Sequence, residues 1–228
     1  MAEKRERRPR DPEGTREAIL EAAGARLAKD GPEGLSLSEV AHLAGVNRGT
    51  AYQHFETREK LIKATTEWIS DKMFRAVFGD PATIGERRID QVDPADLTDR
   101  LADFAMENPE QCQAWLVQVL SSPNPLSDPF WKEYEGSIEK FVRTPDLAQE
   151  NIDCEVMSVI MLSGTFLWPI WARAHAKTGK DRRHLARRFT QECLRLSMYG
   201  SLRPESYPEV DKRLRDGALP AKRTKPSR

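Results

Sequence analysis

The chain has 228 residues, of which 36 are Lys or Arg and 36 are Asp or Glu, so its formal net charge is zero. This length and the 39% share of hydrophobic residues allow one large domain or a small domain beside a larger one. They exclude a disordered tail and a disulfide-stapled miniprotein. Because the charges cancel, any attraction to nucleic acid or to a membrane has to come from local patches.

Cysteine use and hydropathy indicate a cytoplasmic protein. Cys112, Cys154 and Cys193 are odd in number and form no CxxC pair, so neither a disulfide framework nor a zinc site is predicted. The N-terminus has basic residues without the apolar stretch of a secretory signal. The most apolar run, 156–171, has 16 residues and is shorter than the roughly 20 needed to span a bilayer.

Two helices are predicted in the first 45 residues. Apolar residues at four-residue spacing predict a helix over 15–29, which ends at Asp30-Gly31-Pro32. Ser36 lies three residues before Glu39, the spacing of a capping box, and predicts the start of a second helix that ends near Gly45.

A short turn then leads into a third helix. Asn47 can cap this helix, which covers 48–55, and Thr57 can cap a fourth that continues to about Phe78. Two short helices joined by a short turn that contains Gly are typical of a helix-turn-helix motif. Val46, Phe55, Leu43 and Leu61 are the expected core residues that hold these helices together.

The rest of the chain also predicts helices. After an expected loop over 79–93, helical segments are predicted at 94–107, 109–121, 127–143, 151–178 and 181–199, and no segment predicts a strand. Asp93, Asp96, Asp99 and Asp103 share one side of the first of these segments and are expected to be a solvated face. The fold class is therefore all-α.

Several runs at fixed spacing resemble the TetR family of bacterial transcriptional regulators. They are 19–23 (Ile-Leu-Glu-Ala-Ala), Gly31, 36–41, 44–55 and 59–61, about a fifth of the chain. Gly24 and Arg26 depart from the larger apolar residues usual in the first helix, so that helix is expected to pack less firmly, and Ala51 replaces a commoner Leu or Val. The resemblance implies a three-helix DNA-binding domain followed by a helical ligand-binding and dimerisation domain.

The chain divides accordingly into four expected segments. These are a basic arm at 1–14, the DNA-binding domain at 15–61 with its motif at 36–55, an effector-binding and dimerisation domain at 62–200, and a basic tail at 201–228. Residues 1–60 hold 11 basic and 11 acidic residues, which argues against a DNA-binding role for this part of the chain.

The third helix carries the main candidates for DNA contact. Arg48, Gly49 and Thr50 supply a cation, a position without a side chain and a hydroxyl, which let the backbone approach phosphates. Arg48 can also pair with guanine, and Gln53 can pair with adenine.

Other candidates would contact the phosphate backbone. Tyr52 and His54 are expected to do so from the third helix, with packing between helices as their alternative role. The remaining candidates are Ser36, Lys60, Thr15 and Arg10. Arg10 belongs to the basic arm, which either follows DNA or is a solubilising tail.

The helix over 151–178 is apolar on nearly all sides, so it must bury two faces. The family resemblance implies that the last two helices pair with those of a second subunit, and Pro169 is expected to kink the first of them. The residues expected at this dimer interface are Phe166, Trp171, Leu185, Phe189 and Leu196.

The family resemblance also implies a small-molecule pocket among the middle helices. The residues expected to line it, each with core packing as its alternative role, are Trp68, Phe104, Trp115, Trp131, Phe141 and Met161. Few charged residues lie among them, which favours an apolar effector. No cofactor and no metal are predicted.

The sequence thus predicts a homodimeric repressor that a small-molecule effector releases from a palindromic operator on double-stranded DNA. The alternative is an effector-independent architectural or interaction protein that binds DNA with little sequence preference. An enzyme is not predicted, because the sequence has no HExxH and no GxSxG motif.

Overall fold

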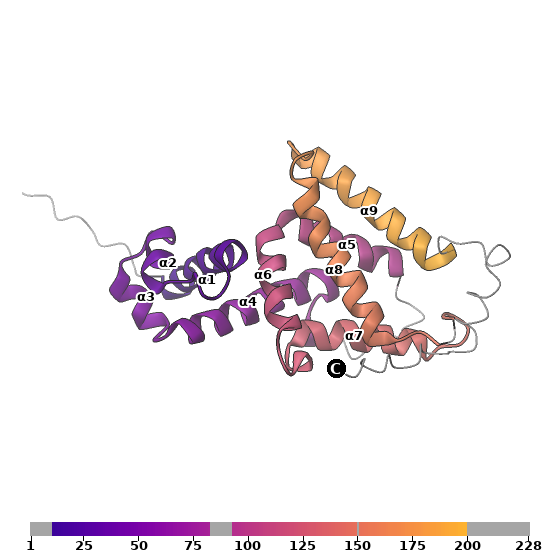
Figure 1. Ribbon diagram of the computed structural model, residues 1–228, viewed down its shortest axis with the longest axis horizontal. Helices are drawn as coiled ribbons and strands as arrows, with labels where there is room; N and C mark the ends of the chain where they lie inside the picture. Colours follow the sequence, from indigo (N-terminus) through magenta and orange to yellow (C-terminus); the bar gives the residue numbers. More distant parts are fainter. Residues whose placement is uncertain (1–10, 83–92, 150, 200–228) are drawn as a thin grey trace, which may run out of the picture.

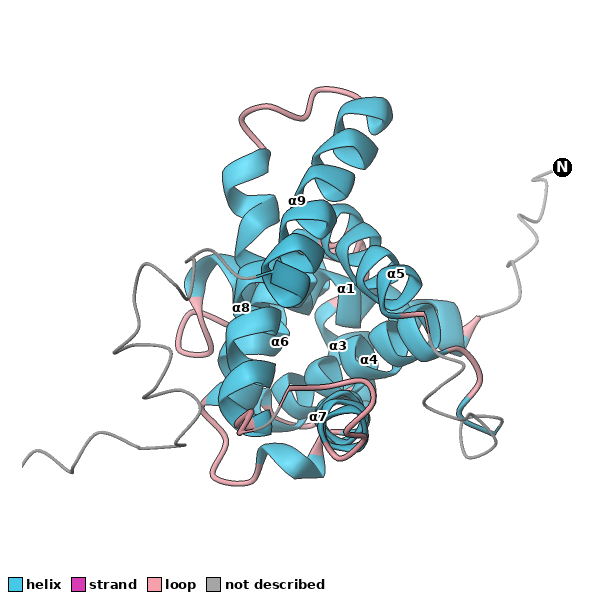
Figure 2. Ribbon diagram, turned by 90° about the vertical axis from the view of Figure 1, so that its right-hand side faces the viewer, coloured by secondary structure: helices cyan, strands magenta, loops and turns pink. Residues whose placement is uncertain are grey.

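The computed structural model describes residues 11–82, 93–149 and 151–199, and all regular structure in these ranges is helical (Figures 1 and 2). The helices are α1 (Pro12–Asp30), α2 (Leu37–Leu43), α3 (Arg48–His54), α4 (Arg58–Phe78), α5 (Pro94–Glu107), α6 (Pro109–Leu120), α7 (Pro129–Val142), α8 (Cys154–Ala172) and α9 (Gly179–Tyr199), with a 3-10 turn at Pro125–Ser127 before α7. The all-α prediction is confirmed. The predicted basic arm and tail lie almost entirely outside the described residues, as does most of the loop expected over 79–93.

Helix α1 begins three residues earlier than expected. The carboxylate of Asp11 accepts a hydrogen bond from the backbone N–H of Gly14 at 2.9 Å, and Pro12 occupies the first helical position, where its missing N–H costs nothing. Gly31, with φ +69°, ends the helix in a backbone conformation that favours glycine. The predicted arm over 1–14 therefore includes the first residues of α1.

Helix α1 packs firmly, so the expectation of weak packing at Gly24 and Arg26 is wrong. Gly24 itself is buried, together with Ile19, Leu20, Ala23 and Leu27 of the same helix. The guanidinium of Arg26 pairs with Asp30 at 2.9 Å and with Glu39 of α2 at 2.9 Å. The first helix is thus fixed both to α2 and to the longer helices behind it.

Helix α4 connects the two ends of the molecule. Its first turn is capped by Thr57, whose hydroxyl accepts from the N–H of Lys60 at 3.2 Å, as predicted. In Figure 1 it runs from the small N-terminal helices into the group formed by the later helices. Its buried side chains join both parts in one continuous hydrophobic core that extends from Ile19 to Phe166.

The carboxylate of Asp128 fastens three helices together. It accepts from the hydroxyl of Ser70 on α4 at 2.8 Å and from the indole N–H of Trp115 on α6 at 3.0 Å. It also caps α7 by accepting from the N–H of Trp131 at 3.0 Å. Side chains from α4, α6 and α7 therefore share one polar centre at the edge of the core.

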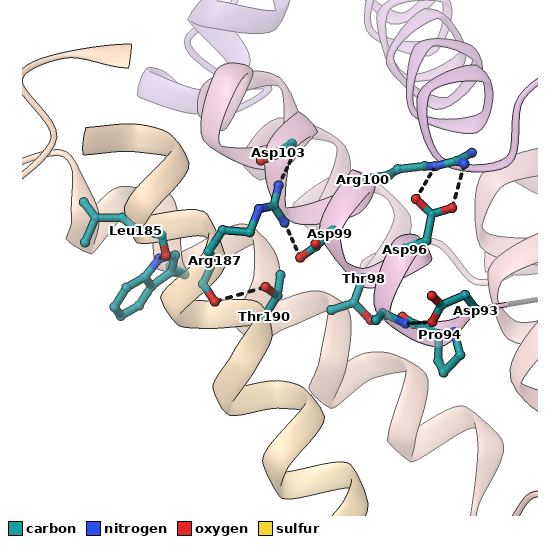
Figure 3. Close-up of polar contacts among 12 residues, drawn as sticks. Asp93, Pro94, Asp96, Thr98, Asp99, Arg100, Asp103, Leu185, Arg187 and Thr190 are labelled. Carbon is teal, nitrogen blue, oxygen red and sulfur yellow. Dashed lines mark hydrogen bonds and ion pairs between the residues drawn. The ribbon is translucent and has the colours of Figure 1, made fainter. Parts of the chain in front are cut away.

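Helices α5 and α9 pack on each other along much of their length, and an arginine joins them (Figure 3). Arg187 of α9 forms ion pairs with Asp99 and Asp103 of α5. The expectation that the aspartates of α5 form a solvated face is therefore wrong for these two. Their four-residue spacing places both carboxylates on the side of α5 that meets α9.

Helix α8 buries only one of its apolar faces in the protomer. The buried face carries Ser158, Leu162, Thr165, Phe166, Pro169 and Ala172. Five large apolar side chains on the other sides are exposed by 41 to 64%, namely Val156, Ile160, Leu167, Ile170 and Trp171. The sequence predicts two faces to bury, and the protomer covers only one of them.

Helix α8 is also, among the described helices, the one long and apolar enough to cross a membrane. It has 19 residues and a mean hydropathy of 1.4 in its most apolar window, 28% of which is buried. The length argument made from the 16-residue run 156–171 does not hold for this helix, because the helix extends beyond the run at both ends. Its contacts with α5, α6, α7 and α9 are those of a helix packed in a helical bundle.

Candidate nucleic-acid interface

Helices α2 and α3 form a helix-turn-helix. The turn begins at Ala44 and includes Gly45, whose φ of +68° is the left-handed conformation that a side chain would oppose. Two backbone bonds close it, from Val46 N to Ala41 O at 2.9 Å and from Gly45 N to His42 O at 3.1 Å. Ala51, which is 1% exposed, allows α3 to lie close to its neighbours.

Asn47 caps α3, as the sequence predicts. Its side-chain oxygen accepts from the N–H of Thr50 at 2.8 Å and from the hydroxyl of Thr50 at 3.0 Å. The exposed side of α3 then consists of Arg48, Gly49, Tyr52 and Gln53. Because Ala51 and Phe55 point into the core, these four residues form one surface at the end of the molecule that Figure 1 draws in indigo.

Three contacts join the segments around this surface to one another. Arg26 joins α1 to Glu39 of α2 at 2.9 Å, and Arg58 of α4 pairs with Glu33 at 3.4 Å. Arg16 of α1 lies with its guanidinium carbon 5.5 Å from the ring centre of Phe55. Arg16 was not among the expected residues, although it precedes the buried Leu20 by four residues and so lies on the core-facing side of α1.

Arg48 and Tyr52 are in contact on the exposed surface of α3. The guanidinium carbon of Arg48 lies 5.3 Å from the ring centre of Tyr52, and its Nη2 lies 3.5 Å from the tyrosine hydroxyl. Gln53 is exposed beside them, whereas His54 is half-buried with its ring centre 6.2 Å from that of Phe55. A phosphate contact of His54 stays a prediction.

The structure corrects two details of the second helix. Ser36 occupies the position before α2, but its hydroxyl makes no capping hydrogen bond, and Glu39 is paired with Arg26, so the predicted capping box does not form. Leu43, expected in the core, is 56% exposed because α2 buries Leu37, Val40 and Ala41 instead. Val46, Phe55 and Leu61 do pack in the core.

The candidates at the edge of the surface already have partners. The ammonium of Lys60 pairs with Glu56 and lowers the pKa of that carboxyl. The hydroxyl of Thr15 donates to the backbone oxygen of Asp11 at 2.7 Å within α1. Arg10 lies outside the described residues.

The aromatic residues expected around an effector occupy different environments. Trp115 and Trp131 are fully buried, and their indole N–H groups donate to Asp128 at 3.0 Å and to Glu135 at 2.7 Å. Phe104 is also buried, at 8% exposure. The half-buried members of the set are Trp68, Phe141 and Met161.

Two of the five expected dimer residues are buried inside the protomer. Phe166 and Leu185 are 0% and 5% exposed, because Phe166 packs edge-on against Trp115 and Leu185 packs in a small cluster between α5, α8 and α9. They cannot contact a second subunit and are removed from the expected interface. Trp171 and Leu196 are 53% and 45% exposed, and Phe189 is half-buried against Gly164 of α8.

The N-terminal helix-turn-helix, with its exposed second helix, places this chain in the class of helix-turn-helix proteins. A larger group of helices follows it. Residues 19–65 match the family model described as bacterial regulatory proteins, tetR family. The matched residues cover the second half of α1, the whole motif and the start of α4. This match assigns residues 19–65 to the family's DNA-binding region, and the all-helical fold agrees with it.

Named relatives and solved structures agree with this assignment. The chain is 33% identical over 88 residues to the HTH-type transcriptional repressor Rv3405c of Mycobacterium tuberculosis, a match that covers 38% of this chain and 47% of the relative. The chain thus matches about half the length of that relative.

Two solved structures extend the similarity to the later helices. A gamma-butyrolactone receptor described as ArpA-like is 25% identical, with a TM-score of 0.51, over 79% of this chain and 98% of that one. The structure of AibR in complex with isovaleryl coenzyme A and operator DNA is 16% identical, with a TM-score of 0.57, over 78% of this chain and 97% of that one. The latter similarity shows the fold alone.

Proposed function

We propose that this protein is a sequence-specific DNA-binding transcriptional regulator that acts as a repressor. The observation that carries the proposal is the exposed surface of α3, where Arg48, Tyr52 and Gln53 lie together on a helix that packs against α2. An arginine fork and a glutamine amide are side chains that pair with base edges in the major groove. The related repressor of M. tuberculosis supports the sign of regulation.

The protein acts as a homodimer in this proposal. The uncovered apolar face of α8 supports it, because five large apolar side chains on one helix exceed what a monomeric surface usually leaves in water. A twofold dimer places its two α3 helices about 34 to 36 Å apart, one turn of DNA, and reads a palindrome. Trp171, Leu196 and Phe189 remain the proposed interface residues together with the exposed residues of α8.

The proposal includes two functional parts and a small-molecule effector. The protein is cytoplasmic. Residues 15–61 bind the operator, and residues 62–200 bind the effector and the second subunit. Helix α4 continues across the boundary between these two parts. The named gamma-butyrolactone receptor supports an effector of low polarity. Trp68, Phe141 and Met161 are the proposed contacts, while Trp115, Trp131 and Phe104 become accessible only if the core opens.

Release follows from linkage between the two sites. An effector that binds more tightly to a conformation that cannot span the operator lowers the DNA affinity by the ratio of its affinities for the two conformations. Helix α4 supports such a link, because Ser70 joins it to Asp128 and α7 while its N-terminal end packs against α1.

The test is selection of bound duplexes from a random DNA pool by the purified protein at near-physiological salt, followed by sequencing. Enrichment of an inverted repeat is the expected result and supports the regulator and the dimer together. Salt-sensitive binding to all duplexes without enrichment would instead favour the architectural alternative. No binding to any duplex would contradict both.

A further inference from the structure

Arg48 lies at an electrostatically unfavourable position. It is the first residue of α3, directly after the cap Asn47, where the helix dipole is positive and disfavours a cation. In the described ranges, no carboxylate lies within ion-pair distance of its guanidinium, whereas Arg26 and Arg58 near the same motif each pair with a glutamate. The Arg48 side chain instead contacts Tyr52.

Tyr52 is placed to hold this side chain. It follows Arg48 by four residues, and helical side chains lean toward the N-terminus, so its ring lies over the turn that carries Arg48. The guanidinium carbon lies 5.3 Å from the ring centre, within the range of a cation–π contact. The distance of 3.5 Å between Nη2 and the hydroxyl is at the limit of a hydrogen bond, so the ring face makes the main contact.

We infer that Tyr52 is a positioning residue for Arg48 and that its ring contributes to the base preference of α3. This inference rests on the proposed function. A guanidinium that stacks by its face keeps the N–H groups at its edge available for the two acceptors of a guanine. At an exposed site the cation–π contact favours the stacked geometry by roughly two- to five-fold, which limits the freedom the arginine loses on binding.

The inference separates two roles of one side chain. A phosphate contact through the hydroxyl strengthens binding to every sequence equally. A platform formed by the ring strengthens binding only to sequences that carry the base pair read by Arg48. Removing the hydroxyl and removing the ring therefore have different consequences, which three variants can measure.

The variants are Tyr52→Phe, Tyr52→Leu and Arg48→Lys, tested on the duplex that the wild-type protein enriches from a random pool. Dissociation constants are measured for this duplex and for duplexes with one base pair changed in each half-site. The base pair whose preference Arg48→Lys lowers most is the one that Arg48 reads, because lysine keeps the charge but lacks the planar fork. Both residues are exposed, and thermal melting followed by circular dichroism confirms that each variant folds.

We expect Tyr52→Leu to reduce the preference at the Arg48 base pair by roughly two- to five-fold and to leave the preference at the Gln53 base pair unchanged. Tyr52→Phe should keep both preferences, whatever affinity the lost hydroxyl costs on all sequences. In a double-mutant cycle, Tyr52→Leu should add no further loss of preference to Arg48→Lys, because the platform then has no fork to position.

Two outcomes would overturn the platform while leaving the proposed function intact. One is a Tyr52→Leu variant that keeps the full preference at the Arg48 base pair, and the other is an Arg48→Lys variant that changes no preference. A wild-type protein that enriches no sequence at all would contradict the proposed function itself, and the platform with it.

Discussion

Gln53 is the residue on α3 whose chemistry points most directly to one base. Its amide is exposed beside Tyr52 and can accept from and donate to adenine at the same time. We expect Gln53→Ala to relax the preference at one base pair per half-site by about 1 to 3 kcal/mol, as measured by competition between duplexes. Gln191→Ala, an equally exposed change on α9, is the control and should alter no preference. An unaltered preference in Gln53→Ala would show that this residue reads no base.

Gly24, inside α1, lowers the stability of the fold relative to an alanine at the same position. Gly in a helix interior is less favourable than Ala by about 0.8 to 1 kcal/mol, and a Cβ at Gly24 would make ordinary contacts with Ile69 and Gln111 at 3.7 Å. We therefore expect Gly24→Ala to raise the free energy of unfolding by about 1 kcal/mol or slightly more, measured by denaturant titration.

Gly136 of α7 provides the matched control, because nothing lies within 4 Å of a Cβ built there. Gly136→Ala measures helix propensity alone, so the difference between the two variants isolates packing at the junction of α1, α4 and α6. A loss of stability in Gly24→Ala would show that α1 has less room against α6 than the structure indicates.

The ion pairs of Arg187 join helix α9 to helix α5 (Figure 3). The three side chains are 36 to 42% exposed, so solvent screens much of their attraction. We expect Arg187→Gln to lower the free energy of unfolding by about 1 kcal/mol at low salt, partly because Asp99 and Asp103 then repel each other at four-residue spacing. The loss should shrink in urea titrations at about 0.5 M salt, where charges are screened within a few ångströms.

Arg188 is the control for this prediction. It is exposed on the same helix, and no aspartate or glutamate of the described segments lies within ion-pair distance of it. Arg188→Gln should therefore change stability by less than about 0.5 kcal/mol. Equal effects of the two variants on stability would mean that the net charge of α9, and not the ion pairs of Arg187 with α5, determines the loss.

Several helix starts could be predicted from local signals in the sequence, although α1 and α8 have other bounds than expected, and long-range pairs could not be predicted. Three helix starts are marked by Thr57, Pro94 and Pro109. The helices α4, α5 and α6 begin within one residue of the positions predicted from them. Asp99 and Asp103 look like solvent-exposed residues because their partner Arg187 lies more than 80 residues further along the chain. The capping box at Ser36 failed for the same reason, since Glu39 is bound by Arg26 from another helix.

The candidate surface follows the same division. The sequence predicts which residues of α3 are exposed, because the turn at Gly45 and the cap at Asn47 fix the helix and its periodicity fixes the face. It does not predict that Arg48 rests on Tyr52, since a spacing of four residues permits this contact without requiring it. Leu43 shows the limit of hydropathy, because this leucine is the last residue of a short helix and is 56% exposed.

For the whole molecule, the uncovered face of α8 decides whether two recognition helices act together. Ile160 is the most exposed residue of this face, at 64%, so Ile160→Glu should leave the protomer folded and prevent a second subunit from packing there. We expect a monomer in sedimentation velocity and a loss of operator affinity of about 10²- to 10⁴-fold, because the two half-sites are then bound independently. Leu126→Glu, a change at a similarly exposed leucine in the 3-10 turn before α7, should alter neither quantity.

An Ile160→Glu protein that remains dimeric would show that α8 is covered by something other than the dimer partner. If this variant were monomeric but bound the operator with full affinity, the dimer would not be the form that reads the palindrome.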